Sequence, residues 1–185
     1  LKSRGVTKID QLVLTKSEPK QLDHVLEISK AFNLGEILVT EETLSKREFM
    51  DKLKESKVKV VAIKTGQQLP IFGSSLEVIT TQNTDKNDSI TMYGKLLNQT
   101  FLVTGDIEDK FLTKSYPKLQ ADIVITHQQA SNKKTDVEIL KTLQPKATII
   151  SVDKKKKFKE KNGESNQELG NSIYQTNQKG AIRFK

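Results

Sequence analysis

The chain has 185 residues, a net charge of +8 and no cysteine. The length suits one domain, residues 1–185, and the lack of cysteine excludes disulfides, zinc ribbons, thiol nucleophiles and iron–sulfur clusters. No apolar run approaches the roughly 20 residues of a membrane-spanning helix. The first residues do not form a signal peptide, and a start at Leu1 predicts a fragment of a longer protein. A pI of about 9.5 predicts an anionic partner, such as nucleic acid or an acidic membrane surface.

The first third of the chain predicts alternating strands and helices. Residues 9–15 form an apolar, β-rich run that predicts a buried strand. Pro19 is placed to start a helix with an apolar stripe, and Gly35 is expected to end it. A strand is expected at 36–39. A second amphipathic helix is expected at 45–56, and a strand at 58–63.

The rest of the sequence predicts a run of antiparallel strands, followed again by alternating strands and helices. Strands are expected at 68–72 and 76–80, and then a hairpin whose strands, 89–96 and 100–104, are joined through 97–99. The remaining elements are expected to be helices at 107–115, 136–143 and 164–169, and strands at 122–126, 147–152, 172–176 and 181–184. This order predicts an α/β fold of layered mixed sheets covered by helices. The strands around 12–14, 101–104, 123–125 and 148–152 are expected to be buried in the sheet.

Several short stretches, in order, carry a family resemblance. They are LVLT at 12–15 followed by KSEPKQ, KLL at 95–97, TFLVTGD at 100–106, ADIVITHQQAS at 121–131 and PKATIISV at 145–152. Together they resemble the C-terminal metallo-β-lactamase-like domain of the ComEC competence and DNA-internalisation proteins. The resemblance spans nearly the whole chain and implies a metallo-β-lactamase-like fold. It also implies that the family domain's first strands lie outside this chain.

The resemblance also implies where a metal would be bound. Active family members place a His-x-His-x-Asp-His motif, or a variant of it, after the strand that ends here at Thr15. Its side chains bind one or two divalent metals, zinc or manganese, which activate a water molecule. At those four positions this chain carries Lys16, Glu18, Lys20 and Gln21. A protonated amine cannot ligate a cation and repels it.

The downstream ligand positions are also altered. Asp106 stands where the family has a bridging acid, whereas Gln128 and Gln129 fill the two histidine positions and Ala130 the glycine. Glu160 falls near a further family histidine. The site is therefore predicted to be degenerate, with no metal cofactor and no catalytic residue.

The chain has two histidines, and each has two interpretations. His24 could be a displaced ligand, but an ordinary histidine on a helix surface is the favoured interpretation. His127 ends a strand beside the altered site, so it could ligate a metal or hydrogen-bond to Asp106 or a backbone carbonyl. Asp106 itself is expected to cap the following helix.

The run at 153–161 is the one low-complexity segment. Its six lysines and two acids give a net charge of +4, half of the chain's surplus. The run could be a solvated surface loop, or it could contact phosphates without reading sequence, helped by Lys16 and Lys20. Phe158 could stack on a base. The candidate DNA-binding residues are Lys154, Lys155, Lys156, Lys157, Lys159 and Lys161.

The sequence supports three functional hypotheses. The first is a non-catalytic module that handles DNA, single-stranded in this hypothesis, within a ComEC-like protein. The second is a nuclease that recruits a metal through Glu18, Asp106, His127 and His24. The third is a purely structural domain. The resemblance further implies a bacterial cell-membrane protein, with this domain on the extracellular side and linked to the membrane-embedded remainder. A sheet edge exposed by the absent strands could also support a homo-oligomer.

Overall fold

The computed structural model describes residues 1–71, 73–81, 89–105, 107, 109–127, 140, 142–151, 172–176 and 182. Within these ranges, side chains are described at every position except Lys20, Asp109, Lys110 and His127. No helix in these ranges is long and apolar enough to cross a bilayer.

The N-terminal part of the chain forms a parallel three-stranded sheet with helices between its strands. After a 3₁₀ turn, η1 (Lys2–Arg4), the strands follow in the order β1-β2-β3. The elements are β1 (Lys8–Val13), α1 (Pro19–Ala31), β2 (Asn33–Thr40), α2 (Glu41–Ser45), α3 (Arg47–Leu53), η2 (Lys54–Ser56) and β3 (Lys59–Ile63). The first strand therefore lies at an edge of this sheet.

The remainder forms a mixed seven-stranded sheet with the order β10-β9-β8-β7-β6-β5-β4. Strands β4 to β7 pair antiparallel, and β7 to β10 pair parallel. The elements are β4 (Gln68–Ile71), β5 (Ser74–Thr80), β6 (Thr91–Leu96), β7 (Gln99–Val103), α4 (Asp109–Ser115), β8 (Ile123–His127), β9 (Ala147–Ser151) and β10 (Ser172–Gln175).

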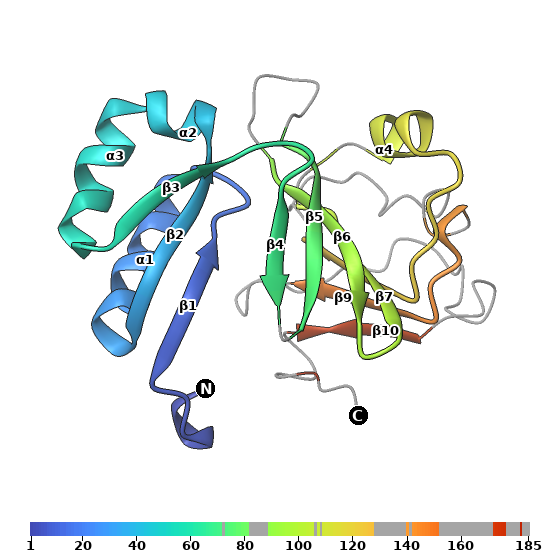
Figure 1. Cartoon of the computed structure of the whole chain (residues 1–185), viewed down its shortest axis with the longest axis horizontal. Coiled ribbons are helices and arrows are strands. Elements are labelled where there is room, and N and C mark those ends of the chain that lie inside the picture. Colours follow the sequence, from blue (N-terminus) through green and yellow to red (C-terminus); the bar gives the residue numbers. More distant parts are fainter. Residues whose placement is uncertain are drawn as a thin grey trace.

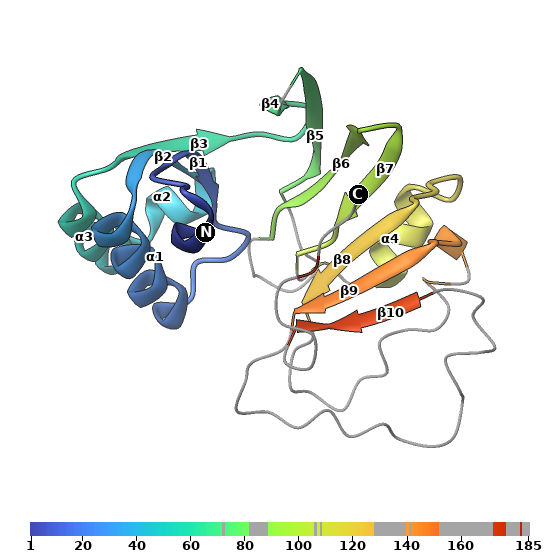
Figure 2. The ribbon, with the colours of Figure 1, turned by 90° about the horizontal axis from the view of Figure 1, so that it is seen from below.

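The two sheets and their helices form four layers. Figure 1 shows the two sheets side by side, and Figure 2 shows α1 and α3 outside one sheet and α4 outside the other. Between the sheets, Leu38 and Ile63 pack with Val78 and Met92 of the facing sheet. Separate apolar clusters join α1 and α3 to the small sheet and α4 to the large one. This is the layered α/β arrangement that the sequence predicts.

Burial on both faces explains why β2 carries three consecutive apolar residues, Ile37, Leu38 and Val39. Ile37 and Val39 pack toward the helices, whereas Leu38 packs toward the other sheet. All three are at most 1% exposed. A parallel strand that is covered on both faces reads as a continuous apolar run, and such a run is present here.

Three sequence predictions about this half need correction. The first helix ends at Ala31, and Gly35 lies inside β2, where a Cβ would come within 2.5 Å of the Asp10 carbonyl oxygen. Glycine is therefore needed for the close approach of β1. The predicted helix at 45–56 consists of α3 followed by η2, and a break at Lys46 separates it from a further helix, α2, that the sequence did not predict. The strand at 12–14 belongs to the small sheet and not to the sheet that contains β7 to β9.

The predicted hairpin is confirmed. Strands β6 and β7 are joined by Leu97 and Asn98, which both adopt positive φ, 50° and 63°. Two consecutive positive φ values are typical of the two-residue turn that matches the twist of paired strands. The segments predicted as a helix at 164–169 and a strand at 181–184 lie outside the described residues, apart from Ile182.

Candidate functional site

The carboxyl ends of β1, β7 and β8 meet through the segment that precedes β6. The Ile90 N–H donates to the Thr15 carbonyl oxygen at 3.2 Å. Gly105, with φ of +57°, packs so closely that a Cβ would lie 2.7 Å from the Ile90 carbonyl oxygen. Thr104 Oγ1 donates to Thr126 Oγ1 at 3.1 Å. The carboxyl ends of these three strands therefore lie together at one end of the fold, where open α/β sheets build their sites.

Lys16, at the first predicted ligand position, is buried at this end. Its side chain is 9% exposed, and its Nζ lies 2.7 Å from Glu18 Oε1 in a hydrogen-bonded ion pair. Glu18, at the second predicted ligand position, has a side chain that is 55% exposed. Lysine is rarely buried unless it is paired. The buried charge of Lys16 is therefore paired with the Glu18 carboxylate.

Ser17 and Lys46 add a second polar link that the sequence did not reveal. Lys46 Nζ donates to Ser17 Oγ across 29 residues of sequence. Lys46 stands between α2 and α3, so this bond joins the loop after β1 to the helices after β2. Nothing in the sequence marks Lys46 among the other lysines, because its role depends on the break between the two helices.

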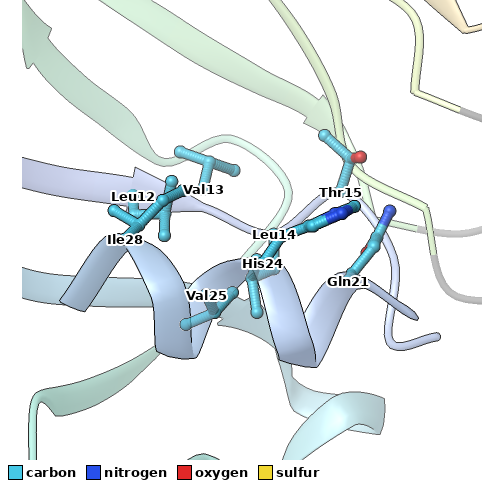
Figure 3. A pocket seen from close by; sticks show the side chains of 8 residues that line it. All are labelled: Leu12, Val13, Leu14, Thr15, Gln21, His24, Val25 and Ile28. Carbon is cyan, nitrogen blue, oxygen red and sulfur yellow. The ribbon is translucent and has the colours of Figure 1, made fainter. Parts of the chain in front are cut away.

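A cavity of about 190 Å³ lies between the end of β1 and α1. Its walls are apolar, with Leu12, Val25 and Ile28 among them, and Thr15, Gln21 and His24 are polar members of its lining. Figure 3 shows the His24 and Gln21 side chains beside Thr15. Gln21 Oε1 is buried and has no hydrogen-bond partner among the described residues. The structure thus brings together Gln21, a predicted ligand position, and the alternative ligand His24.

These residues do not fit a divalent metal ion. Of the predicted ligand positions with described side chains, Lys16 offers no lone pair while protonated, Gln21 offers one amide oxygen, and the Glu18 carboxylate is bonded to Lys16. Within the described part of the chain, no three His, Cys, Asp or Glu residues are grouped so that they could hold a metal. The metal site of a hydrolytic enzyme is held by several His, Cys or carboxylate side chains together.

The other predicted site residues are placed only in part. Lys20 is the second residue of α1 and His127 the last residue of β8, where it pairs with Ser151, but neither side chain is described. Asp106, Gln128, Gln129, Ala130 and Glu160 lie outside the described residues, as do the six lysines and Phe158 of the run at 153–161. Their roles stay predictions.

At the opposite end of β7 and β8, a second polar cluster holds three strands together. Asp122 Oδ2 accepts from both the N–H and the Oγ1 of Thr100 at 2.8 Å, and Asp122 Oδ1 pairs with Lys146 Nζ at 2.8 Å. These bonds, first that of Lys146 and then those of Thr100, hold the pKa of the Asp122 carboxyl well below its usual range. The cluster lies where β7, β8 and β9 begin, so its role is structural.

Comparison with known proteins agrees with this architecture. Along its full length the chain is 21% identical to ComE operon protein 3 of Bacillus subtilis (strain 168). The chain is homologous to that protein. It spans 26% of the relative's length, about a quarter. The family resemblance predicted from the sequence is thereby confirmed. No protein-family model matches the chain.

Solved structures support the same fold. The metallo-beta-lactamase fold protein YhfI from Bacillus subtilis aligns with a TM-score of 0.54 and 16% identity, over 77% of this chain and 64% of that one. A diphosphatase of the PhnP family aligns with a TM-score of 0.52 and 16% identity, over 80% of this chain and 61% of that one. A mutant of the CmlA beta-hydroxylase aligns with a TM-score of 0.53 and 15% identity, over 77% of this chain and 36% of that one. The chain has the metallo-β-lactamase fold.

Proposed function

We propose that this chain is a non-catalytic, DNA-handling module of a ComEC-like competence protein. The observation that carries the proposal is the Lys16–Glu18 ion pair, which lies after β1 where active family members begin their metal-binding motif. In this proposal the module is linked to the membrane-embedded remainder of its parent protein and works on the extracellular side.

The ion pair supports loss of catalysis for an electrostatic reason. A buried ammonium already supplies a positive charge at the position where a metal would be ligated, and a second cation beside it would be repelled. Glu18 neutralises that ammonium at 2.7 Å, so a metal that used Glu18 as a ligand would have to compete with the Lys16 ammonium for the same carboxylate. The geometry therefore favours the ion pair over a metal.

The proposed DNA contact rests on the lysine run and not on Lys16. The prediction that Lys16 helps to contact phosphate does not fit its 9% exposure and its bond to Glu18. The run at 153–161 carries a net charge of +4 and lies outside the described residues, so its contribution is argued from charge alone. Lysines contact the phosphate backbone without reading sequence, and such binding weakens steeply with salt.

The salt dependence of DNA binding tests this part of the proposal. Binding of a fluorescent single-stranded oligonucleotide is measured between low and moderate salt, for the parent chain and for a variant with Ser at Lys154, Lys155, Lys156, Lys157, Lys159 and Lys161. If each lysine neutralises one phosphate, the run contributes about −4 to the slope of log affinity against log salt. The variant is expected to lose that contribution.

A charge-matched control makes the result specific to the run. The control variant carries Ser at six exposed lysines elsewhere, Lys2, Lys30, Lys52, Lys57, Lys59 and Lys114, and so has the same net charge. It is expected to keep most of the parent's slope. Equal loss of slope in both variants would assign the binding to overall charge. No change in the run variant would favour the purely structural hypothesis.

The nuclease hypothesis remains the alternative. Among the described residues, the placement of His24 beside Thr15 and Gln21 favours it. It requires a stoichiometric metal and DNA cleavage that is lost on Asp106→Ala.

The proposal also includes a homo-oligomer that forms through the edge strand β1. It would appear as a concentration-dependent mass in analytical ultracentrifugation.

A further inference from the structure

The loop at 15–18 lies between β1 and α1 and is bonded to two distant parts of the fold. The Thr15 carbonyl oxygen accepts from the Ile90 N–H at 3.2 Å, next to the start of β6 in the large sheet. Lys46 Nζ donates to Ser17 Oγ across 29 residues of sequence. In Figure 2 the blue segment between β1 and α1 reaches toward the part of the chain that forms the large sheet. The loop is therefore tied both to that sheet and to the helices that follow β2.

The bond from Lys46 holds two helices at once. The Lys46 N–H donates to the Thr43 carbonyl oxygen at 3.1 Å, near the end of α2. The Lys46 carbonyl oxygen accepts from the Met50 N–H at 2.9 Å, in α3. Lys46 Nζ also lies 3.8 Å from Glu42 Oε1. A side chain that starts at this junction and ends on Ser17 fixes the junction against the loop.

Inside the loop, the ammonium of Lys16 is bonded to the residue that begins α1. Lys16 is 8% exposed, and its Nζ lies 2.7 Å from Glu18 Oε1. Glu18 is the N-cap residue of α1, and its carbonyl oxygen accepts from the N–H groups of Gln21 and Leu22 at 3.0 and 3.3 Å. Because one of its partners is buried, this ion pair is screened by salt less than a fully exposed pair. The loop is thereby tied to a third element.

We propose that the loop at 15–18 is a metal-independent clasp. Successive residues bind the large sheet, the start of α1 and the α2–α3 junction, and the Lys16 ammonium supplies a fixed positive charge among them. The clasp keeps the shape of the end of the fold where β1, β7 and β8 meet, and it needs no divalent cation to do so. This inference rests on the loss of the metal in the proposed function, and does not depend on DNA binding.

Native-state hydrogen exchange followed by NMR tests the clasp, because each tied element has an amide that reports on it. The reporters are the N–H groups of Ile90, Leu22 and Met50. Ser17→Ala removes the acceptor of the Lys46 ammonium, so the three reporters should exchange about tenfold faster, the effect of losing one hydrogen bond to a charged group. The reference amides are those of Tyr116 and Lys146, which bond to Leu112 and Asp122 in the other half of the fold and should keep their rates.

Two further variants make the result specific to one bond. Lys46→Met removes the donor of the same bond, so the double variant with Ser17→Ala should exchange no faster than either single variant. The matched control is Ser45→Ala, because the Ser45 hydroxyl bonds only within α2, to the Glu42 carbonyl oxygen, among the described residues. It should leave the rates of Ile90 and Leu22 unchanged. Additive effects of the two clasp variants, or an equal effect of the control, would overturn the clasp.

The remaining outcomes separate the clasp from the proposed function. Equal acceleration at reporter and reference amides would show a general loss of stability, and unchanged reporters would show that the bond holds nothing; either result overturns the clasp alone. The parent chain is also measured with EDTA, and its rates are expected to stay the same. Faster exchange at the reporters in EDTA would show that a bound metal holds the loop, and would overturn both the clasp and the proposed loss of the metal.

Discussion

Gly105 fixes the convergence of the strand ends, and replacing it by alanine tests that geometry. Its φ is +57°, and an added Cβ would meet Ser89 Oγ at 2.6 Å and the Ile90 carbonyl oxygen at 2.7 Å. The positive φ costs a residue with a Cβ about 1–2 kcal/mol, and the overlap with backbone adds about 1–3 kcal/mol. Gly105→Ala should therefore lower the free energy of unfolding by about 3 kcal/mol.

Gly66 provides the control because its φ is +86° and an added Cβ would meet nothing within 4 Å. Gly66→Ala should lose only the conformational part, about 1 kcal/mol. Urea unfolding followed by circular dichroism measures both variants. With an m-value of about 2 kcal/mol/M, the midpoint should fall by about 1.5 M for Gly105→Ala and about 0.5 M for Gly66→Ala. Equal shifts would refute the packing of Gly105 against Ile90, and with it the gathering of the strand ends.

Three further predictions concern the layers, the second polar cluster and the hairpin tip. Leu38→Ala should lower the free energy of unfolding by about 2–5 kcal/mol, because Leu38 is 1% exposed between the two sheets; a loss below 1 kcal/mol in urea unfolding would argue against their packing. Asp122→Asn should be less stable than the parent at neutral pH, and since the pKa of Asp122 is lowered, the difference should shrink as pH falls below about 4. A pH-independent difference in the urea midpoints would contradict the ion pair with Lys146. Leu97→Asn should raise the free energy of unfolding by about 0.5–1 kcal/mol, since asparagine tolerates positive φ, and calorimetry showing a lower Tm would contradict the strain.

Local patterns predicted most of the fold. Apolar runs located β2, β8 and β9, and the segment Leu97-Asn98-Gln99 between two β-rich runs located the β6–β7 turn. The interpretation of Gly35 failed because its close contact is with Asp10, 25 residues away in sequence, and a helix-ending glycine gives the same local pattern. The prediction of one helix at 45–56 missed α2, which lies directly before it. Thr40 caps that helix, because its Oγ1 accepts from the Thr43 N–H at 3.0 Å. A threonine followed by two glutamates was the available signal.

The candidate site was less predictable than the fold. Sequence indicated that Lys16 and Glu18 stand at altered ligand positions, but not that they bond to each other or that Lys16 is buried. Lysine is ordinarily exposed, so burial of one particular lysine follows from the packing around it and not from its type. The Asp122 cluster joins residues up to 46 positions apart in sequence, from Thr100 to Lys146, and no local pattern marks it.

Metal content and nuclease activity of the purified chain test the central claim most directly. The chain is incubated with zinc or manganese, dialysed and analysed for bound metal, and the same samples are assayed for cleavage of single- and double-stranded DNA. Because Lys16 is paired with Glu18 at the end of β1, we expect well below one equivalent of metal and no cleavage. About one equivalent of metal, together with manganese-dependent cleavage that Asp106→Ala abolishes, would contradict the account.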